Sequence, residues 1–229
     1  MPSQSPIRPK LLKGALAVYP SHAPGAVVSQ VIVFQFNPES VKRTLVHRAS
    51  APPDKASSPG AAKEDVLRVA GPPIETISMT VDMHASDQLA EPQSNSVVAE
   101  HGLHPALATL ELLMYPSTMD SRKIEQLAAA GQVQVTPADL PLVLLLWGKS
   151  RVVPVKITSF SVSEDAFDSR LNPISAKVEL AMQVLSHIEF PASSVGRDAF
   201  IAYQKSKEAL ARSGALGSVD SVLRDLLPF

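Results

Sequence analysis

The sequence predicts an α+β fold built mainly on antiparallel strands, and three observations support that class. Within the predicted strand 74–84 (IETISMTVDMH), residues 76–84 alternate polar and apolar side chains without a fault, which is the pattern of a half-buried strand. Residues 103–115 change to the helical spacing of leucines, and further strand patterns follow. Strands interrupted by one helix-rich segment are typical of an antiparallel sheet or barrel with packed helices.

The other elements are assigned by periodicity, composition and turn residues. The predicted strands cover residues 11–19, 27–36, 74–84, 142–147, 152–162 and 176–185. Helical spacing predicts a helix at residues 104–115; further helices are predicted at 120–130, closed by Gly131, at 198–212 from composition, and at 219–227. Residues 37–48 can prolong the second strand after a kink. Between Ile157 and Phe160 the apolar parity slips by one residue, which predicts a β-bulge or a sharp bend.

Composition indicates three parts. We expect a flexible N-terminus at residues 1–9, a β domain at 10–188 and a helical C-terminal extension at 189–229. Two segments have the composition of loops. Residues 49–63 are rich in proline and small residues, and residues 85–101 form a polar connection.

Charge and cysteine content exclude several classes of function. The formal net charge is −1, so there is no basic excess for nucleic acid. The absence of cysteine excludes disulfides, iron–sulfur clusters and cysteine nucleophiles. No apolar run approaches the roughly 20 residues of a membrane span. The N-terminal residues do not resemble a signal peptide, so we expect a cytoplasmic protein without membrane insertion.

Two polar clusters were considered as metal sites. His101 and His104 have a spacing that suits a metal only if a carboxylate joins them, and they flank a helix start, so we interpret them as a capping segment. Glu164, Asp165 and Asp168 lack the glycine of a calcium loop and are interpreted as a solvated turn. No phosphate loop or nucleophile motif is present. We therefore predict no catalytic residues, no cofactor and no metal.

The stretch FQFNPES at residues 34–40 has the character of a strand end. Phe34 and Phe36 are two residues apart and are expected on one face. Pro38 lacks an N–H and disfavours helical dihedrals at Asn37, so the ladder is expected to end there.

Two further motifs follow later in the chain. Trp147 ends an apolar strand, where a tryptophan usually anchors the core, and Gly148 allows the turn into the next strand. The stretch FDSRLNPISA at residues 167–176 is predicted as a hairpin loop that re-enters a strand at Ala176. Within it, Asn172 is expected to take the left-handed conformation.

These motifs, in this order, resemble the tube and baseplate protein family of contractile injection systems, which are phage-tail-like particles of bacteria. The resemblance covers roughly residues 10–188. It rests on Phe34, Phe36, Asn37, Pro38, Trp147, Gly148, Phe167, Asn172, Pro173 and Ala176. It implies a tail-tube-like β-barrel or sandwich with one packed helix. It also implies a ring, expected to be a hexamer, in contact with spike, inner-tube and other baseplate proteins.

The chain departs from the family in three places. The family usually has glycine where Asn172 stands, and its P-x-R-A ending is Pro173-Ile174-Ser175-Ala176 here. Some members carry a LysM module, for which residues 191–229 have no room. We expect this helical tail to contact a neighbouring baseplate subunit instead.

The resemblance implies a structural role rather than an enzymatic one. The expected function is to join the spike to the inner tube and to template assembly of the tube within a phage-tail-like particle. Two alternatives remain open at this stage. One is the main inner-tube or tube-terminator subunit, and the other is a small β-barrel enzyme of flavin type.

Overall fold

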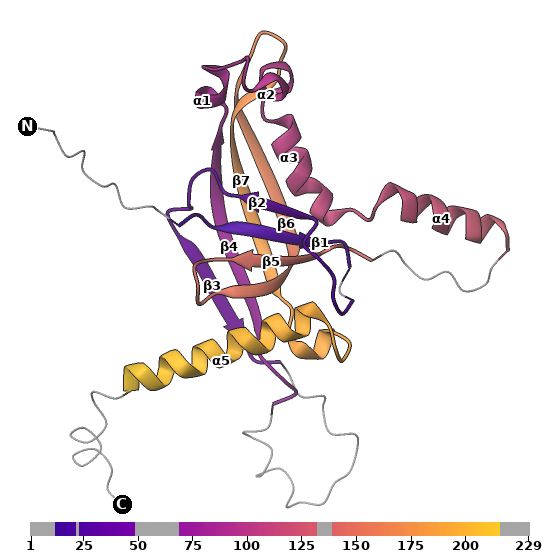
Figure 1. Cartoon of the computed structure of the whole chain (residues 1–229), viewed down its shortest axis with the longest axis vertical. Helices are drawn as coiled ribbons and strands as arrows, with labels where there is room; N and C mark the ends of the chain where they lie inside the picture. The colour runs from indigo at the N-terminus through magenta and orange to yellow at the C-terminus, as the bar shows by residue number, and fades with distance from the viewer. Residues whose placement is uncertain (1–11, 22, 49–68, 132–138, 216–229) are drawn as a thin grey trace, which may run out of the picture.

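The computed structural model describes residues 12–21, 23–48, 69–131 and 139–215. The described residues confirm an α+β fold with a seven-stranded sheet (Figure 1). The predicted flexible N-terminus, the loop at residues 49–63 and the helix at residues 219–227 lie outside the described residues.

All pairings in the sheet are antiparallel, in the order β2-β1-β5-β6-β7-β4-β3. The strands are β1 (Ala15–Tyr19), β2 (Gln30–Val33), β3 (Val41–Val46), β4 (Ile74–His84), β5 (Leu142–Leu146), β6 (Val152–Phe167) and β7 (Pro173–Val184). The strand predicted from perfect alternation, β4, has the bounds that the sequence indicated.

The helices are shorter elements around this sheet, apart from the last one. They are α1 (Ser86–Leu89), α2 (Ser96–His101), α3 (His104–Glu111), α4 (Thr118–Ala129) and α5 (Val195–Ala215), with 3-10 turns η2 (Leu112–Met114) and η3 (His187–Glu189). The predicted polar connection at residues 85–101 thus contains α1 and α2. In Figure 1, α4 extends away from the sheet, and α5 crosses the sheet near one end.

The sheet folds over on itself, and the main core lies between its two parts. Leu16 of β1 and Leu145 of β5 belong to the same buried cluster as Ile77 of β4 and Val178 of β7. Figure 1 shows β1, β2 and β5 running across β4 and β7, while the longer β6 takes part in both parts of the sheet. Helices α3 and α5 complete the cluster; their buried residues in it are Leu107, Leu110, Phe200 and Tyr203.

The bulge predicted after Ile157, in the strand that is β6 of the structure, is confirmed. The pairing of β6 with β7 shifts its register between Ile157 and Ser159. Ile157 is buried, Ser159 is exposed, and Phe160 packs against the main core again. The extra residue restores the inward direction of the apolar side chains along the rest of the strand.

The second predicted strand is corrected in its length and its faces. It ends at Val33 rather than Phe36, and Phe34 and Phe36 do not share a buried face. Phe34 is 3% exposed and Phe36 is 48% exposed, because the chain bends after Phe34. Residues 37–48 do not prolong this strand either, since they form β3 beside β4 at the opposite edge of the sheet.

Gly14, just before β1, lies against the rings of Trp147 and Phe34. A Cβ atom at this position would lie 2.6 Å from the Trp147 ring and 2.9 Å from the Phe34 ring. Both rings pack in or against the main core, so neither can move freely. Glycine is therefore required here by space.

We expect Gly14→Ala to lower the free energy of unfolding by about 1–3 kcal/mol, because the added methyl group overpacks the two rings. Urea denaturation followed by tryptophan fluorescence measures this change. Gly214→Ala is the matched control, since a Cβ atom there meets nothing within 4 Å. It should be neutral or slightly stabilising in a helix. Equal stability of Gly14→Ala and the unsubstituted protein would contradict the packing argument.

Candidate assembly surfaces

One part of the sheet presents a face of polar side chains, which we call the polar face. It lies on β3, β4, β7 and the adjacent stretch of β6. Its members are Lys42, Thr44, Thr76, Ser78, Thr80, Asp82, Lys156, Ser159, Ser161, Ser163, Lys177, Glu179 and Gln183, all exposed or half-buried. The opposite face of the same strands belongs to the main core. An antiparallel sheet with one covered and one open face gives this alternation.

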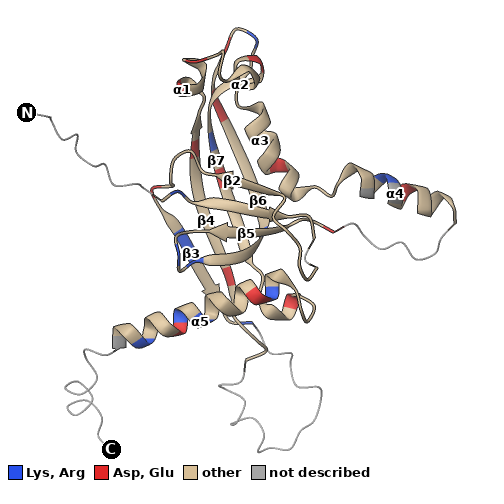
Figure 2. Cartoon of the chain, in the orientation of Figure 1, with Lys and Arg blue, Asp and Glu red and all other residues tan. Residues whose placement is uncertain are grey.

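The strand register places the polar face in regular rows. Ser78 pairs with Lys42 on one side and with Ala181 on the other. Charges of opposite sign also pair, since Asp82 lies opposite Lys177 in the register. Lysines and carboxylates are mixed on this face, so it has no strong charge of one sign. Figure 2 shows the same mixture along α5, where both signs occur.

The edges of this polar part of the sheet have no partner strand among the described residues. At one edge, β3 pairs only with β4. At the other edge, β5 covers β6 only at residues 152–155, so the later residues of β6 pair on the β7 side alone. Leu45 is 51% exposed and Val46 is 58% exposed on β3. Unpaired edges with exposed apolar side chains are able to pair with another chain.

The FQFNPES motif connects the two parts of the sheet through its polar side chains. The Asn37 side chain accepts a hydrogen bond from Gly14 N (2.8 Å) and donates one to Leu12 O (2.9 Å). Gln35 Nε2 donates to His84 O (2.7 Å), and His84 N donates to Gln35 Oε1 (2.9 Å). The side-chain amides of Gln35 and Asn37 thus supply hydrogen bonds in place of backbone strand pairing, after β2 has ended at Val33. Pro38, half-buried, follows this bend.

The Trp147-Gly148 pair lies where the sequence placed it. Trp147 is half-buried against the main core, and its backbone N donates to Arg151 O (2.8 Å) across the turn into β6. Gly148 has φ +71°, a conformation that suits glycine. The pair therefore anchors the β5–β6 hairpin.

The loop between β6 and β7 differs from the prediction in one residue. Leu171, and not Asn172, has the left-handed backbone, with φ 66°. Asn172 uses its side chain instead, donating from Nδ2 to Asp168 Oδ2 (2.9 Å) and to Glu100 O (3.0 Å). Pro173 and Ala176 are buried where the chain re-enters the sheet.

Phe167 is 47% exposed at the end of β6. The acidic residues beside it are also placed differently from the expected turn, because Glu164 and Asp165 lie within β6 itself. Their side chains are exposed on the strand. The pairing of β6 with β7 extends to Phe167 because β7 already begins at Pro173 rather than at Ala176.

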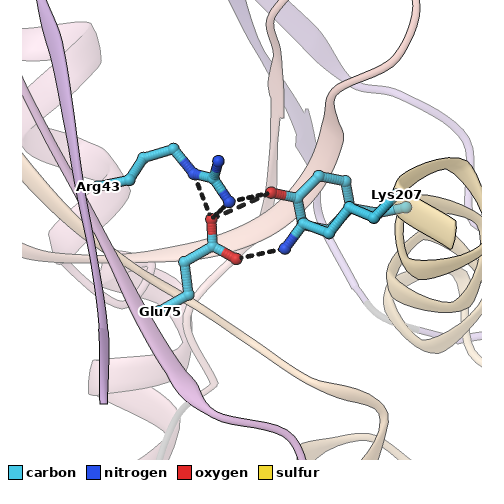
Figure 3. A network of polar contacts seen from close by, with 4 residues as sticks. Arg43, Glu75 and Lys207 are labelled. Carbon is cyan, nitrogen blue, oxygen red and sulfur yellow. Dashed lines mark hydrogen bonds and ion pairs between the residues drawn. The ribbon is translucent and has the colours of Figure 1, made fainter. Parts of the chain in front are cut away.

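A buried carboxylate joins the sheet to α5 (Figure 3). Glu75 of β4 is 3% exposed, and its Oε1 accepts from Arg43 Nε of β3 at 2.7 Å and from Tyr203 Oη at 3.0 Å. Its Oε2 accepts from Lys207 Nζ at 2.9 Å, and this ammonium also lies 4.0 Å from the centre of the Tyr203 ring. We call these four residues the Glu75 network.

The Glu75 network keeps its groups in defined protonation states. Burial by itself would raise the pKa of Glu75, but the hydrogen bonds from Lys207 and Arg43 outweigh it, so this pKa is lower than usual. Burial, together with the negative charge of Glu75, raises the pKa of Tyr203. The carboxylate therefore stays charged and the tyrosine hydroxyl stays neutral and able to donate.

The described residues contain no group of three or more His, Cys, Asp and Glu side chains that could hold a metal ion. His101 ends α2 and His104 begins α3. Glu100 Oε2 lies 3.9 Å from His101 Nε2. In the same described residues, no helix is long and apolar enough to cross a membrane.

No protein-family model matches the sequence, and no curated protein matches it significantly.

Sequence reasoning missed the Glu75 network and the amide contacts of Gln35. Glu75 falls on the apolar side of the β4 alternation, between Ile74 and Thr76, and a carboxylate on a core face is the one signal that was available. Its partners are 32 residues earlier and more than 120 residues later in the chain, so spacing could not reveal them.

We expect Glu75→Gln to lower the free energy of unfolding at neutral pH by about 2–3 kcal/mol, because it leaves two cations without their counterion. Glu75 has a lowered pKa in the folded state, so its contribution is complete above the ordinary glutamate value of about 4.3. This stabilising contribution of Glu75 is lost as the pH falls through its lowered pKa in the folded state.

The measurement is urea denaturation of both proteins between neutral and strongly acidic pH. The two stability curves should converge in acid, where Glu75 is protonated in the folded state and resembles glutamine. Glu179→Gln, on the exposed polar face, is the matched control and should change stability by less than about 0.5 kcal/mol. Equal stability of Glu75→Gln and the unsubstituted protein at neutral pH would refute the role of the network.

Proposed function

We propose that this chain is a structural subunit of the baseplate of a contractile injection system, where it joins the spike to the inner tube. The observation that carries the proposal is the polar part of the sheet, which, within the described parts of the chain, has one open polar face and an unpaired edge on each side. The ordered motifs of the tube and baseplate family add to it. In this role the chain acts by assembly rather than by catalysis.

The two edges differ, so they suit a head-to-tail contact. The β3 edge of one copy would pair with the later residues of β6 in the next copy, satisfying backbone groups that are otherwise exposed to water. A heterologous contact of this kind closes into a ring when the rotation per subunit fits. The family resemblance implies six subunits.

The polar face supports the same arrangement. If the sheet continues around the ring as a tail-tube-like barrel, the apolar face remains covered by β1, β2, β5 and the helices of each subunit. The polar face then lines the inside of the ring. Its mixed charges would avoid strong attraction to a passing molecule.

Spike and inner-tube proteins are the proposed partners above and below the ring. Helices α1 and α2, in the connection between β4 and α3, lie at one end of the molecule, and α5 lies at the other (Figure 1). The two ends thus present different surfaces to the two neighbours. A main tube subunit would repeat in many rings, whereas a spike-to-tube adaptor occurs in one, so the copy number per particle separates these two assignments.

Electron microscopy of particles from cells with and without this gene tests the proposed role. We expect deletion to abolish assembled tube and sheath, and complementation to restore them. Particles of normal length in the deletion strain would show that the assembly role is wrong.

A substitution at the edge tests the proposed pairing itself. Leu45→Lys places a charge on the exposed apolar edge of β3 and should reduce ring formation at least tenfold, because charged edge residues oppose strand pairing. The measurement is the ring count in negative-stain images together with light-scattering mass. Met119→Lys is the matched control, since Met119 is 76% exposed on helix α4 rather than on a strand edge. Equal loss of rings in both variants would argue against pairing at β3.

A further inference from the structure

The loop between β6 and β7 combines two features that are unfavourable in isolation. Leu171 has φ 66°, a left-handed conformation in which a bulky side chain is strained and which glycine or asparagine adopts more easily. The same leucine is 77% exposed, and Phe167, where the same loop leaves β6, is 47% exposed. A smaller polar residue at position 171 would relieve the strain and improve hydration.

The loop is held rigidly by bonds that do not use the Leu171 side chain. Asp168 Oδ1 accepts from the backbone N of Arg170 at 2.7 Å and of Asn172 at 2.8 Å. Leu171 N donates to Asp168 O at 3.1 Å, and Asn172 ties the loop to Glu100 O of α2. Hydrogen bonds from Asn172 lower the pKa of Asp168, which keeps it a charged acceptor. The loop therefore fixes the direction of a leucine that the fold itself does not use.

We propose that Leu171 and Phe167 form a contact point that inserts into an apolar socket on another protein. Strained residues persist where the surrounding structure enforces them, and they concentrate at functional sites. Here the hydrogen bonds of Asp168 enforce the strain, and the exposed Leu171 side chain gains little from packing on the described residues of its own subunit, so we assign its benefit to a partner. Figure 1 places the loop beside α1 and α2, at the opposite end from α5.

The charges around the contact point specify the partner further. Residues 164–172 carry three carboxylates and one guanidinium; Glu164 and Asp165 are exposed and Asp168 is half-buried. An acidic collar of this kind is repelled by anionic lipid surfaces and is attracted to basic protein surfaces. The partner is thus a protein whose apolar socket has a basic rim. This inference does not rest on the ring proposed above, because any such protein would cover the loop.

The first test separates a functional leucine from a structural one. Leu171→Asn keeps the left-handed backbone and should leave the melting temperature unchanged or raise it by roughly 2–4 °C. Ser193→Asn is the matched control, since Ser193 is exposed and also has a positive φ, at 84°. A clear fall in melting temperature for Leu171→Asn alone would overturn the inference, because the leucine would then serve the fold.

The second test measures whether the loop is covered in the producing cells. The chain has no cysteine, so Arg170→Cys introduces a single thiol beside an intact Leu171. Its reaction with a maleimide should be at least tenfold slower in a gentle extract of those cells than in dilute purified protein. Met119→Cys, at an exposed position of α4, a helix outside the proposed contact surfaces, should react equally fast in both.

Adding Leu171→Asn to Arg170→Cys should restore fast labelling, because the partner loses its apolar contact. Equal labelling rates of Arg170→Cys in extract and purified protein would overturn the inference, as would protection that survives Leu171→Asn. Co-sedimentation of the purified protein with phosphatidylcholine–phosphatidylglycerol vesicles, with protection of the same thiol, would replace the protein socket by a membrane. Normal particles in the gene-deletion strain would refute only the assembly role, since thiol protection is measured independently.

Discussion

The pairing of β7 with both β4 and β6 is the constraint on which the rest of the structure depends. β7 pairs with β4 from Thr76 to His84 and with β6 along nearly its whole length. Because side chains alternate between faces, a slip of one residue would bring Lys177 and Glu179 into the core and expose Val178 and Leu180. The register therefore defines the core and the polar face in one step. The bulge after Ile157 keeps β6 in agreement with this arrangement.

The attachment of α5 follows a different principle. Its first turns pack on a small apolar cluster outside the main core, formed with Ala17, Leu142 and Leu144. Further along, the helix contributes Phe200 and Tyr203 to the main core and ends its contact in the Glu75 network. A buried carboxylate with several donors adds geometric definition that apolar contact alone does not provide, because each donor must meet a particular oxygen.

The surfaces that remain open are consistent with assembly at several separate places. The polar face and its two edges lie on the regular part of the sheet, whereas the Leu171 contact point lies on a strained loop at one end. These surfaces use different chemistry. Backbone pairing at the edges is tolerant of sequence, and an apolar contact within an acidic collar selects its partner by shape and charge. In the assembly we propose, one subunit would bind copies of itself and a different protein without competition between the two contacts.

The sequence by itself determined the elements whose pattern is local. The alternation in residues 76–84 indicated β4, the parity change after Ile157 predicted the bulge, helical spacing located α3, and composition indicated α5. Only the tertiary structure decided which strands became edges, that Phe34 is buried while Phe36 is exposed, and that Leu171 rather than Asn172 takes the strained backbone. The Glu75 network also required the fold, because its members are far apart in the chain. Periodicity reports which way neighbouring side chains point, whereas partners distant in sequence meet only after the sheet has folded over on itself.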